Sequence, residues 1–525
     1  MPSIHSSFQK DRSTSFNLRE EGITTQTNVN KIVTVVFSSE QQIYFLKQQG
    51  NCMSKMKPSK ILLSAFVTSV LSTASFLQAL HANEIVNSDS SSIVNTADTS
   101  AMANSLAIVK SSKMAIKKQT PIKVEISEEN GKYQLLRGGQ PYQVRGAGIS
   151  STDLDSLVKF GGNSMRNWAV DNHAEPAQQL LDRAYAIGIT VSLCLEFARE
   201  RHGFDYNDNT AVAKQLAENR IRVEKYKNHP ALLTWIIGNE VNFDFTNPKV
   251  FDAVNDTAKM IKELDPNHPT TTALAGFDKK ALVAIAERAP DLDFISFQMY
   301  ADLLNLPRYI EEFGFDKPYF VTEWGSVGHW EVHMTEWGAP VENTSTEKAS
   351  NYAKSYSQVL EPYGEQAIGN YVFLWGQKQE KTSTWYGMFL DSGEKTEAVD
   401  VMHHIWRGTW PENRAPRISP IILNEQGAFD DVYLDSGQTY QAAVNVDDSE
   451  GDPIRYHWKI RAESSSDSVG GDSEYVPAIV DGVIKNQDAV IELIAPRKSG
   501  AYRLFVYAFD GHDNAAHANI PFYVK

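Results

Sequence analysis

The sequence predicts an α/β protein in which a (β/α)8 barrel is followed by an all-β immunoglobulin-like sandwich. Short apolar runs alternate with amphipathic stretches from about residue 142 to residue 410. After residue 410 the chain changes to short alternating runs that are separated by polar turns. The composition, 42% hydrophobic and 22% charged over 525 residues, is that of a globular protein with two or three domains.

The N-terminal region carries the pattern of a secretory signal peptide that does not begin at residue 1. A basic run precedes the apolar stretch Ile61–Leu71, and small residues follow it. This order predicts a signal peptide at 53–82, whose apolar stretch is too short to span a membrane. We expect residues 1–52 to be a mis-start or an extension, and residues 83–118, rich in Ser, Asn, Ala and Thr, to be a flexible linker. The mature protein is then secreted or periplasmic and has no transmembrane segment.

Residues 119–410 are predicted to form the barrel, preceded by two short strands that turn at Glu129-Asn130-Gly131. Thr152 with Asp155, and Thr344 with Glu347, are spaced as helix N-caps. A doubly wound sheet is the alternative, but it usually has fewer units and often a Gly-rich phosphate loop, which this sequence lacks. The expected barrel strands are 143–148, 164–168, 190–195, 232–238, 270–275, 294–298, 319–322 and 371–374. The expected helices are 153–160, 176–187, 210–226, 248–264, 279–288, 307–313, 347–360 and 397–410.

Residues 411–416 read as a linker and residues 417–525 as the sandwich. Its expected strands are 441–446, 455–460, 489–494, 501–509 and 520–524. The chain has two cysteines, Cys52 and Cys194, of which the first precedes the signal peptide, so we expect no intrachain disulfide. Five acidic residues of the sandwich either gather a calcium ion or form a solvated acidic turn, and we favour the turn. These residues are Asp447, Asp448, Glu450, Asp452 and Asp510.

The net charge of −15 argues against nucleic-acid binding, because an acidic surface repels phosphate backbones. We predict no metal and no cofactor for the chemistry of this protein, and a monomer that acts on a polysaccharide.

Two strand ends place carboxyl groups at the mouth of the predicted barrel. Strand four runs into Asn239-Glu240, and strand seven runs into Thr322-Glu323. In such barrels the chemistry takes place at the carboxyl ends of the strands. Two carboxyl groups that face one cleft are what glycoside hydrolysis needs.

These strand ends resemble those of the retaining glycoside hydrolases of clan A, over about residues 142–410. The resemblance implies that Glu240 is the general acid/base and Glu323 the nucleophile. The resemblance further implies four residues around the substrate. They are an arginine beside the nucleophile (Arg166), an asparagine on the sugar 2-hydroxyl (Asn239), a tyrosine bonded to the nucleophile (Tyr300) and a tryptophan platform under the cleaved sugar (Trp375). We add Trp168, from the same segment as Arg166, to the substrate-binding residues.

The loop after strand seven repeats the tetrapeptide of the nucleophile at Thr335-Glu336-Trp337-Gly338. No buried-strand run precedes Glu336, so we do not expect it to be the nucleophile. Trp330 and Trp337 are predicted to line substrate subsites. His329, Glu331 and His333 are weak evidence for a metal. Residues 196–206, after strand three, are interpreted equally well as subsites or as a solvated, salt-bridged loop.

Families 2 and 5 of the clan share these motifs, but the order of barrel and sandwich is most similar to glycoside hydrolase family 158. That resemblance implies an endo-β-1,3-glucanase that acts on laminarin-type glucan. The alternatives are an exo-β-glycosidase, an endo-β-mannanase or β-1,4-glucanase, and a transglycosylase. A noncatalytic carbohydrate-binding protein is the alternative from another class, although such a protein would have lost one of the two carboxyl groups.

Overall fold

The computed structural model describes residues 34–37, 43–46, 120–149, 153–170, 175–362, 365–468, 470–481 and 483–525. The expected signal peptide and the expected linker lie outside the described residues, as does Thr152. Two compact units are present. The first, Met1–Lys113, contains the antiparallel pair β1 (Thr34–Phe37) and β2 (Ile43–Leu46), and the second is Met114–Lys525.

Eight parallel strands close into a barrel in the second unit, which confirms the predicted fold class. Each strand pairs with its neighbours along the chain, and the last pairs with the first. The predicted bounds of strands three and five are those observed, whereas strand seven runs on through Glu323 to Gly325. The barrel strands are β6 (Gly146–Gly148), β7 (Ser164–Arg166), β8 (Thr190–Leu195), β9 (Leu232–Asn239), β10 (Thr270–Ala275), β11 (Ile295–Gln298), β12 (Tyr319–Gly325) and β13 (Ala367–Phe373).

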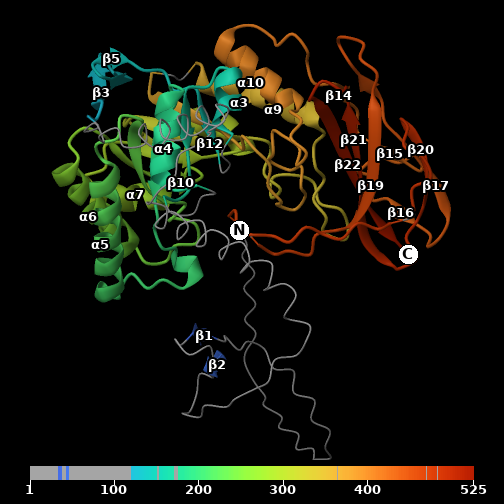
Figure 1. Ribbon diagram of the computed structural model, residues 1–525, viewed down its shortest axis with the longest axis horizontal. Coiled ribbons are helices and arrows are strands. Elements are labelled where there is room, and N and C mark those ends of the chain that lie inside the picture. The colour runs from blue at the N-terminus through green and yellow to red at the C-terminus, as the bar shows by residue number, and fades with distance from the viewer. Residues whose placement is uncertain are drawn as a thin grey trace, which may run out of the picture. The chain divides into compact units, whose positions relative to one another are not determined.

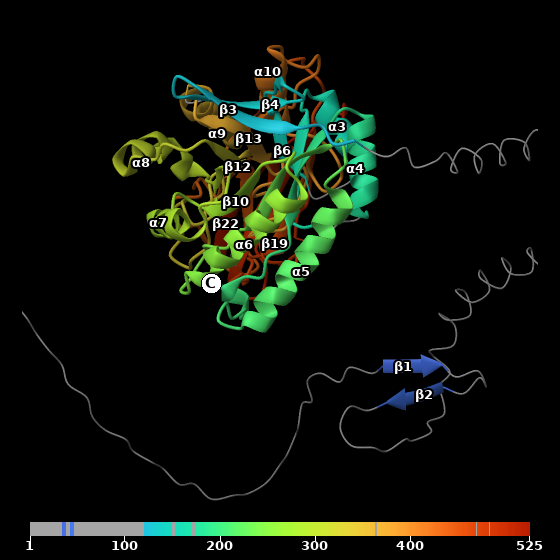
Figure 2. The ribbon, with the colours of Figure 1, turned by 90° about the vertical axis from the view of Figure 1, so that its left-hand side faces the viewer.

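Helices lie outside the ring of strands (Figure 2). Thr344 and Glu347 form the predicted capping box at the start of α9, while Asp153 caps α3. The helix predicted over 347–360 is instead α9 followed by one π-helical turn, Tyr356–Leu360. The helices are α3 (Leu154–Lys159), α4 (Ala177–Ala186), α5 (Asn209–Tyr226), α6 (Lys249–Leu264), α7 (Lys279–Arg288), α8 (Leu306–Phe313), α9 (Ser345–Ser355) and α10 (Glu397–Arg407).

The amino ends of the barrel strands are covered by a hairpin sheet of β3 (Val124–Glu129), β4 (Lys132–Arg137) and β5 (Gln140–Pro141). Val124 and Leu135 of this sheet pack in one apolar cluster with residues of the barrel strands, among them Leu233 and Phe320. Asn130 and Gly131 take positive φ angles in the predicted turn. This end of the barrel is therefore closed, which leaves the opposite end for chemistry.

The C-terminal region is all-β, as predicted. A four-stranded sheet (β16-β22-β21-β19) and a three-stranded sheet (β15-β17-β20) share one apolar core around Trp458, and β14 pairs with β18. The last strand begins five residues earlier than predicted. Cys194, the cysteine in the described part of the chain, is buried and free. The strands are β14 (Arg417–Ile418), β15 (Ile422–Leu423), β16 (Tyr433–Leu434), β17 (Thr439–Ala443), β18 (Val446–Asp447), β19 (Arg455–Ala462), β20 (Val490–Ile494), β21 (Gly500–Phe509) and β22 (Ala515–Val524).

Buried charged groups join the sandwich to the barrel, and the two lie side by side in Figure 1. Arg503 of β21 is buried; it donates to the carbonyl of Pro340 in the barrel and to the carboxyl of Glu463. Glu342 accepts from Lys348 and from the Asn519 side chain of β22. The bonds from Arg503 to Pro340 and from Asn519 to Glu342 cross between the two domains, and breaking them would leave buried polar groups without those partners.

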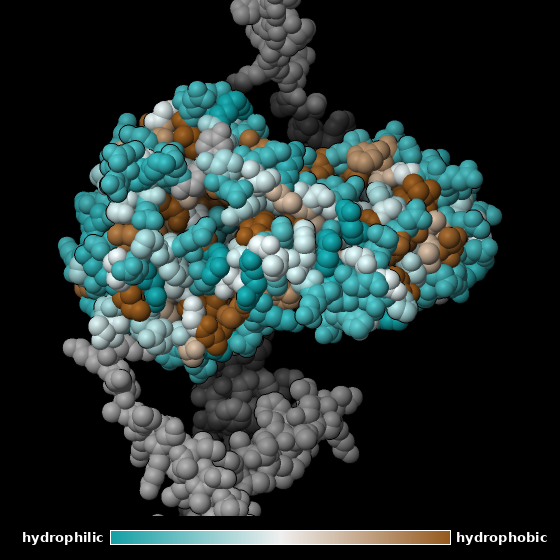
Figure 3. Space-filling view, turned by 90° about the horizontal axis from the view of Figure 1, so that it is seen from above, coloured by the Kyte–Doolittle hydropathy of each residue, from teal (hydrophilic) through white to brown (hydrophobic). Residues whose placement is uncertain are grey.

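The face drawn in Figure 3 is mostly hydrophilic, with hydrophobic side chains in small separate groups. Scattered apolar groups of this kind are normal on protein surfaces. Among the described residues there is no helix with the length and apolar character that crossing a membrane requires.

Candidate active site

Glu240 follows the end of β9, where both Gly238 and Glu240 have positive φ angles. Gly238 has a φ of +75°, and a Cβ atom there would lie 2.6 Å from Val241 and 2.8 Å from Phe197. Glu240 itself has a φ of 52°, in the left-handed region that non-glycine residues rarely adopt. Such strained residues gather at functional sites. Its amide donates to the carbonyl of Ala273 on β10, which holds this conformation in place.

Glu323, near the end of β12, is held by four hydrogen-bond donors. The Arg166 guanidinium (2.6 Å), the Trp168 indole (2.7 Å) and the Gln298 amide (2.9 Å) donate to its Oε1 atom. The Tyr300 hydroxyl donates to its Oε2 atom at 2.8 Å. All four groups are donors to this carboxyl, so the site is built for a carboxylate whose position is fixed.

A second polar side chain, Asn239, belongs to the same network. Its Oδ1 atom accepts from Arg166 at 2.8 Å and from Gln298 at 2.7 Å. Arg166 is 0% exposed, so its charge is compensated within this network. The structure thus brings together the two carboxyl groups predicted from the strand ends, Glu240 and Glu323, and the residues that the resemblance added: Asn239, Arg166, Trp168 and Tyr300.

Gln298 was not predicted as a site residue. It ends β11, two residues before Tyr300, and it bonds both Asn239 and Glu323. The sequence contained one signal for this residue, namely a polar amide at the end of an otherwise apolar strand.

The two carboxyl groups have different environments. Burial first, and the charge of Glu323 second, raise the pKa of Glu240 to about 7, while the charges of Arg199, Arg166 and Arg201 oppose the rise. Glu240 is therefore substantially protonated near neutral pH, while Glu323 is held by donors. This pair offers one proton donor and one carboxylate acceptor, the division of roles that acid–base and nucleophilic catalysis need.

A cleft of about 870 Å³ contains both carboxyl groups. Tyr300 and Trp168 line it, and Trp330, 57% exposed, stands with its ring edge-on to Tyr300 at 5.6 Å. Trp330 is thus placed where we predicted a subsite residue. The loop after β8, 196–206, carries ion pairs and also lines the cleft, so both interpretations of this loop hold. Seven of its members line the cleft: Glu196, Phe197, Ala198, Arg199, His202, Gly203 and Phe204.

The platform role predicted for Trp375 is wrong. Trp375 is 1% exposed, packs against Phe160 and Trp406 in the barrel core, and donates its indole N–H to Ser156. It is not among the residues that line the cleft. Phe373, the last residue of β13, lines the cleft instead and meets Trp168 edge-on at 5.6 Å.

Trp337 and Glu336 lie against the sandwich and do not line the cleft. The Trp337 ring packs against Tyr433 and Tyr523, so the predicted subsite role of Trp337 is wrong. Glu336 is exposed and accepts from the Tyr433 hydroxyl at 2.9 Å. This position agrees with the prediction that Glu336 is not the nucleophile.

The three residues weighed as a metal cluster have separate roles. Glu331 accepts backbone N–H groups of Ala301 and Asp302, His329 faces Glu380 at 3.6 Å, and the His333 ring contacts Phe429. They do not form a ligand set.

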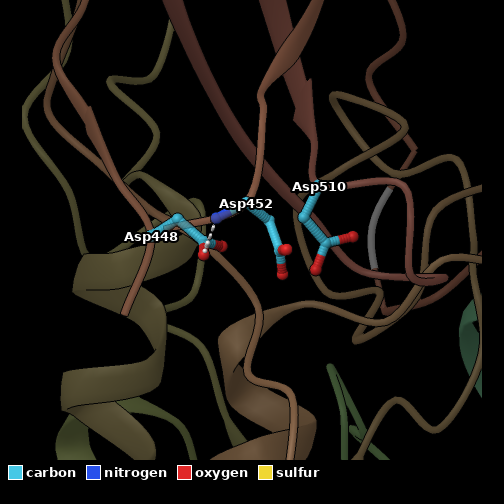
Figure 4. A group of neighbouring side chains, drawn as sticks. All are labelled: Asp448, Asp452 and Asp510. Atoms are coloured by element: carbon cyan, nitrogen blue, oxygen red, sulfur yellow. Dashed lines mark hydrogen bonds between the residues drawn. The ribbon is translucent and has the colours of Figure 1, made fainter. Parts of the chain in front are cut away.

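Three carboxyl groups of the sandwich lie together: Asp448, Asp452 and Asp510 (Figure 4). Calcium prefers such oxygens. However, Asp448 accepts the backbone N–H groups of Glu450 and Asp452, and Asp452 accepts from Asn413 at 2.7 Å. These hydrogen bonds hold Asp448 and Asp452, while Asp510 comes from the connection between β21 and β22; the acidic turn that the sequence favoured stays a prediction.

Comparisons with known proteins agree with this architecture. Residues 151–408 match the family model "Glycosyl hydrolases family 2, TIM barrel domain". A protein of Arabidopsis thaliana named as mannan endo-1,4-beta-mannosidase 4 is 27% identical over 128 residues, which cover 23% of this chain and 31% of that protein. This match spans about a third of the curated relative.

The solved structures that match part of this chain include two β-glucuronidases. The Bacteroides uniformis enzyme is 12% identical, with 77% of this chain and 48% of that chain covered and a TM-score of 0.42. The Dictyoglomus thermophilum enzyme is 17% identical, with 55% of this chain and 54% of that chain covered and a TM-score of 0.42. The closed barrel and the match over residues 151–408 together support a glycoside hydrolase (β/α)8 domain.

Proposed function

We propose that this protein is a retaining glycoside hydrolase that cleaves β-glycosidic bonds by double displacement. The single observation that carries the proposal is the pair of unlike carboxyl groups in one cleft. Glu240 holds a proton near neutral pH, and Glu323 accepts four hydrogen bonds.

In this mechanism Glu323 attacks the anomeric carbon while Glu240 protonates the departing oxygen. Glu240, now ionised, then removes a proton from the water that releases the glycosyl-enzyme. Arg166 and Tyr300 keep the nucleophile aligned, and Asn239 is positioned by Arg166 to meet the sugar beside it. Burial raises the pKa of the Tyr300 hydroxyl well above its usual value, so this group stays a donor throughout.

A polysaccharide or oligosaccharide is the substrate class that the cleft favours. Its volume of about 870 Å³ lies near the upper end of the roughly 300–1,000 Å³ typical of ligand sites. The order of barrel and sandwich resembles family 158 and supports a β-1,3-glucan, cleaved internally, as the first substrate to test. The match to the Arabidopsis protein favours β-1,4-mannan as the second. The basic and apolar pattern at 53–82 supports export of the protein to such a substrate.

The test combines a substrate panel with three variants. Wild-type protein is incubated with β-1,3-glucan, β-1,4-mannan, β-1,4-glucan and aryl β-glycosides, and the products are sized. Glu240→Ala and Glu323→Ala should each lose roughly 10²–10⁴-fold or more in turnover without unfolding. Glu336→Ala, which changes the repeated tetrapeptide outside the cleft, is the matched control and should keep its activity. Wild-type activity in either cleft variant would refute the proposal.

A further inference from the structure

A segment of the sandwich reaches the cleft of the barrel. The chain between β19 and β20, here called the arm and described over 463–468 and 470–481, carries Gly470 and Gly471, which line the same cleft as Glu240 and Glu323. The arm thus belongs to a different domain from the two carboxyl groups that it faces.

Ion pairs fix the tip of the arm to the loop after β8. The Asp472 carboxyl accepts from the Arg201 guanidinium at 2.8 and 3.2 Å and from His202 at 3.3 Å, and it lies 3.8 Å from Arg199. Arg201 also donates to the carbonyl of Gly470 at 3.3 Å. The side chain of Arg201 is only 7% exposed, and its guanidinium binds both oxygen atoms of Asp472. A bidentate, partly desolvated ion pair of this kind is stronger than a hydrogen bond between neutral groups.

A second anchor holds the base of the arm. The Lys381 ammonium donates to the carbonyl of Ser466 at 2.6 Å, and the Lys381 amide donates to Glu474 at 2.9 Å. Lys381 belongs to the barrel loop after β13, so the arm is attached on both sides of the cleft. Together with the buried charges at the domain interface, these contacts make the arm a fixed wall.

The two glycines leave space beside the general acid. A Cβ atom on Gly470 would lie 3.1 Å from Arg201 and 3.6 Å from the Glu240 Oε2 atom, and one on Gly471 would lie 3.2 Å from the Lys378 ammonium. Both residues have positive φ angles, of +58° and +77°, which glycine adopts without strain. The arm therefore adjoins Glu240, the residue that meets the departing oxygen.

We propose that the arm forms the leaving-group side of the active site, where Gly470 and Gly471 make room for a sugar leaving group and Asp472 is a positioning residue that holds Arg201 and the arm in place. This inference rests on the proposed function, because Glu240 defines the leaving-group side only if it is the general acid. The ligand of this subsite is a β-linked sugar, and Lys378 and the arm backbone offer it polar contacts.

Asp472 also acts on the charge balance around Glu240. The charged and titratable groups that face Glu240 are Glu323, Arg166, Arg199, Arg201 and Tyr300. The arginines lower the pKa of Glu240, and Asp472 offsets two of them. Without the charge of Asp472, the pKa of Glu240 falls, and the alkaline limb of the kcat/KM profile moves to lower pH.

The experiment compares full-length Asp472→Ala with Asp467→Asn, a matched change at an exposed acidic residue of the same arm. Each variant is assayed with an oligosaccharide that the wild type cleaves and with the 2,4-dinitrophenyl glycoside of the same sugar, whose leaving group departs without protonation. Asp472→Ala should lose about 10–100-fold in kcat/KM on the oligosaccharide and change by less than about threefold on the dinitrophenyl glycoside. Asp467→Asn should match the wild type on both.

Further measurements separate positioning from general damage to the fold. Asp472→Asn, which keeps the shape of the side chain, should shift the alkaline limb of the oligosaccharide profile to lower pH, and Arg201→Gln should not add its full effect to that of Asp472→Ala. Equal losses on the two substrates, or no loss on the oligosaccharide, would overturn the proposal. Failure of the proposed function is recognised separately, because the wild type would then turn over neither substrate or Glu323→Ala would remain active.

Discussion

The raised pKa of Glu240 predicts that this residue destabilises the folded protein at alkaline pH and that Glu240→Gln removes the penalty. Burial first, and the charge of Glu323 second, raise the pKa from 4.5 to about 7. Below about pH 4.5 the residue is protonated in the folded and the unfolded chain, so it costs nothing. Between pH 4.5 and about pH 7 the unfolded chain releases this proton more readily than the folded chain does, so the stability of the folded protein falls as the pH rises through that range. The full shift corresponds to about 3 kcal/mol.

The assay is scanning calorimetry of the wild type and of Glu240→Gln at pH 4.5, 6 and 8. We expect equal melting temperatures at pH 4.5 and a gain of several degrees for the variant at pH 8, since 1 kcal/mol is worth about 2–4 °C in domains of 150–250 residues. Turnover should fall at the same time, as is common when a strained catalytic group is removed. Glu336→Gln, outside the cleft, is the control and should change little at any pH. A variant that gains nothing at pH 8, or gains equally at all three pH values, would refute the reasoning.

Three further predictions concern the chemistry. Arg166→Met removes two charge-assisted hydrogen bonds, to Glu323 and to Asn239, which are worth about 3–6 kcal/mol together. We therefore expect kcat/KM to fall roughly 10²–10⁴-fold in steady-state assays. A loss below tenfold would contradict the importance of this hydrogen-bond network. Proton NMR of the first product should show the β-anomer, because carboxyl groups on opposing strand ends of a barrel are expected about 5–5.5 Å apart, and an initial α-anomer would exclude double displacement. Chelator should leave turnover unchanged, since two carboxyl groups and water suffice for this reaction; activity that a divalent ion alone restores would contradict this.

The parts of the fold that local sequence patterns control were predicted well. The bounds of β8, β10 and α7 are those expected, because each is an apolar or amphipathic run between clear turn signals. The positions of Glu240 and Glu323 followed from the same patterns, since a polar residue at the carboxyl end of a buried parallel strand lies at the barrel mouth.

The wrong predictions concern residues whose positions are not determined by the local sequence pattern. Trp375 stands two residues beyond the end of β13, so strand alternation no longer decides where its side chain points, and it packs into the core beside Phe160. Trp337 contacts Tyr433, and no periodicity in the barrel sequence reveals which face a second domain covers. Gln298 was missed because one amide at a strand end is also common as a structural residue.

The leaving-group side of the cleft illustrates the same limit most clearly. Gly470 lies 230 positions after Glu240 in the chain, and its neighbourhood reads as an ordinary polar loop. What brings the two together is the docking of the domains, through Arg503 on the carbonyl of Pro340 and Asn519 on the carboxyl of Glu342. These polar groups are buried, so a shifted domain would break the hydrogen bonds and leave the groups without those partners. The shape of the cleft next to Glu240 therefore depends on the contacts of the arm and on the docking of the two domains, and removal of the sandwich would change the cleft as well as the stability of the barrel.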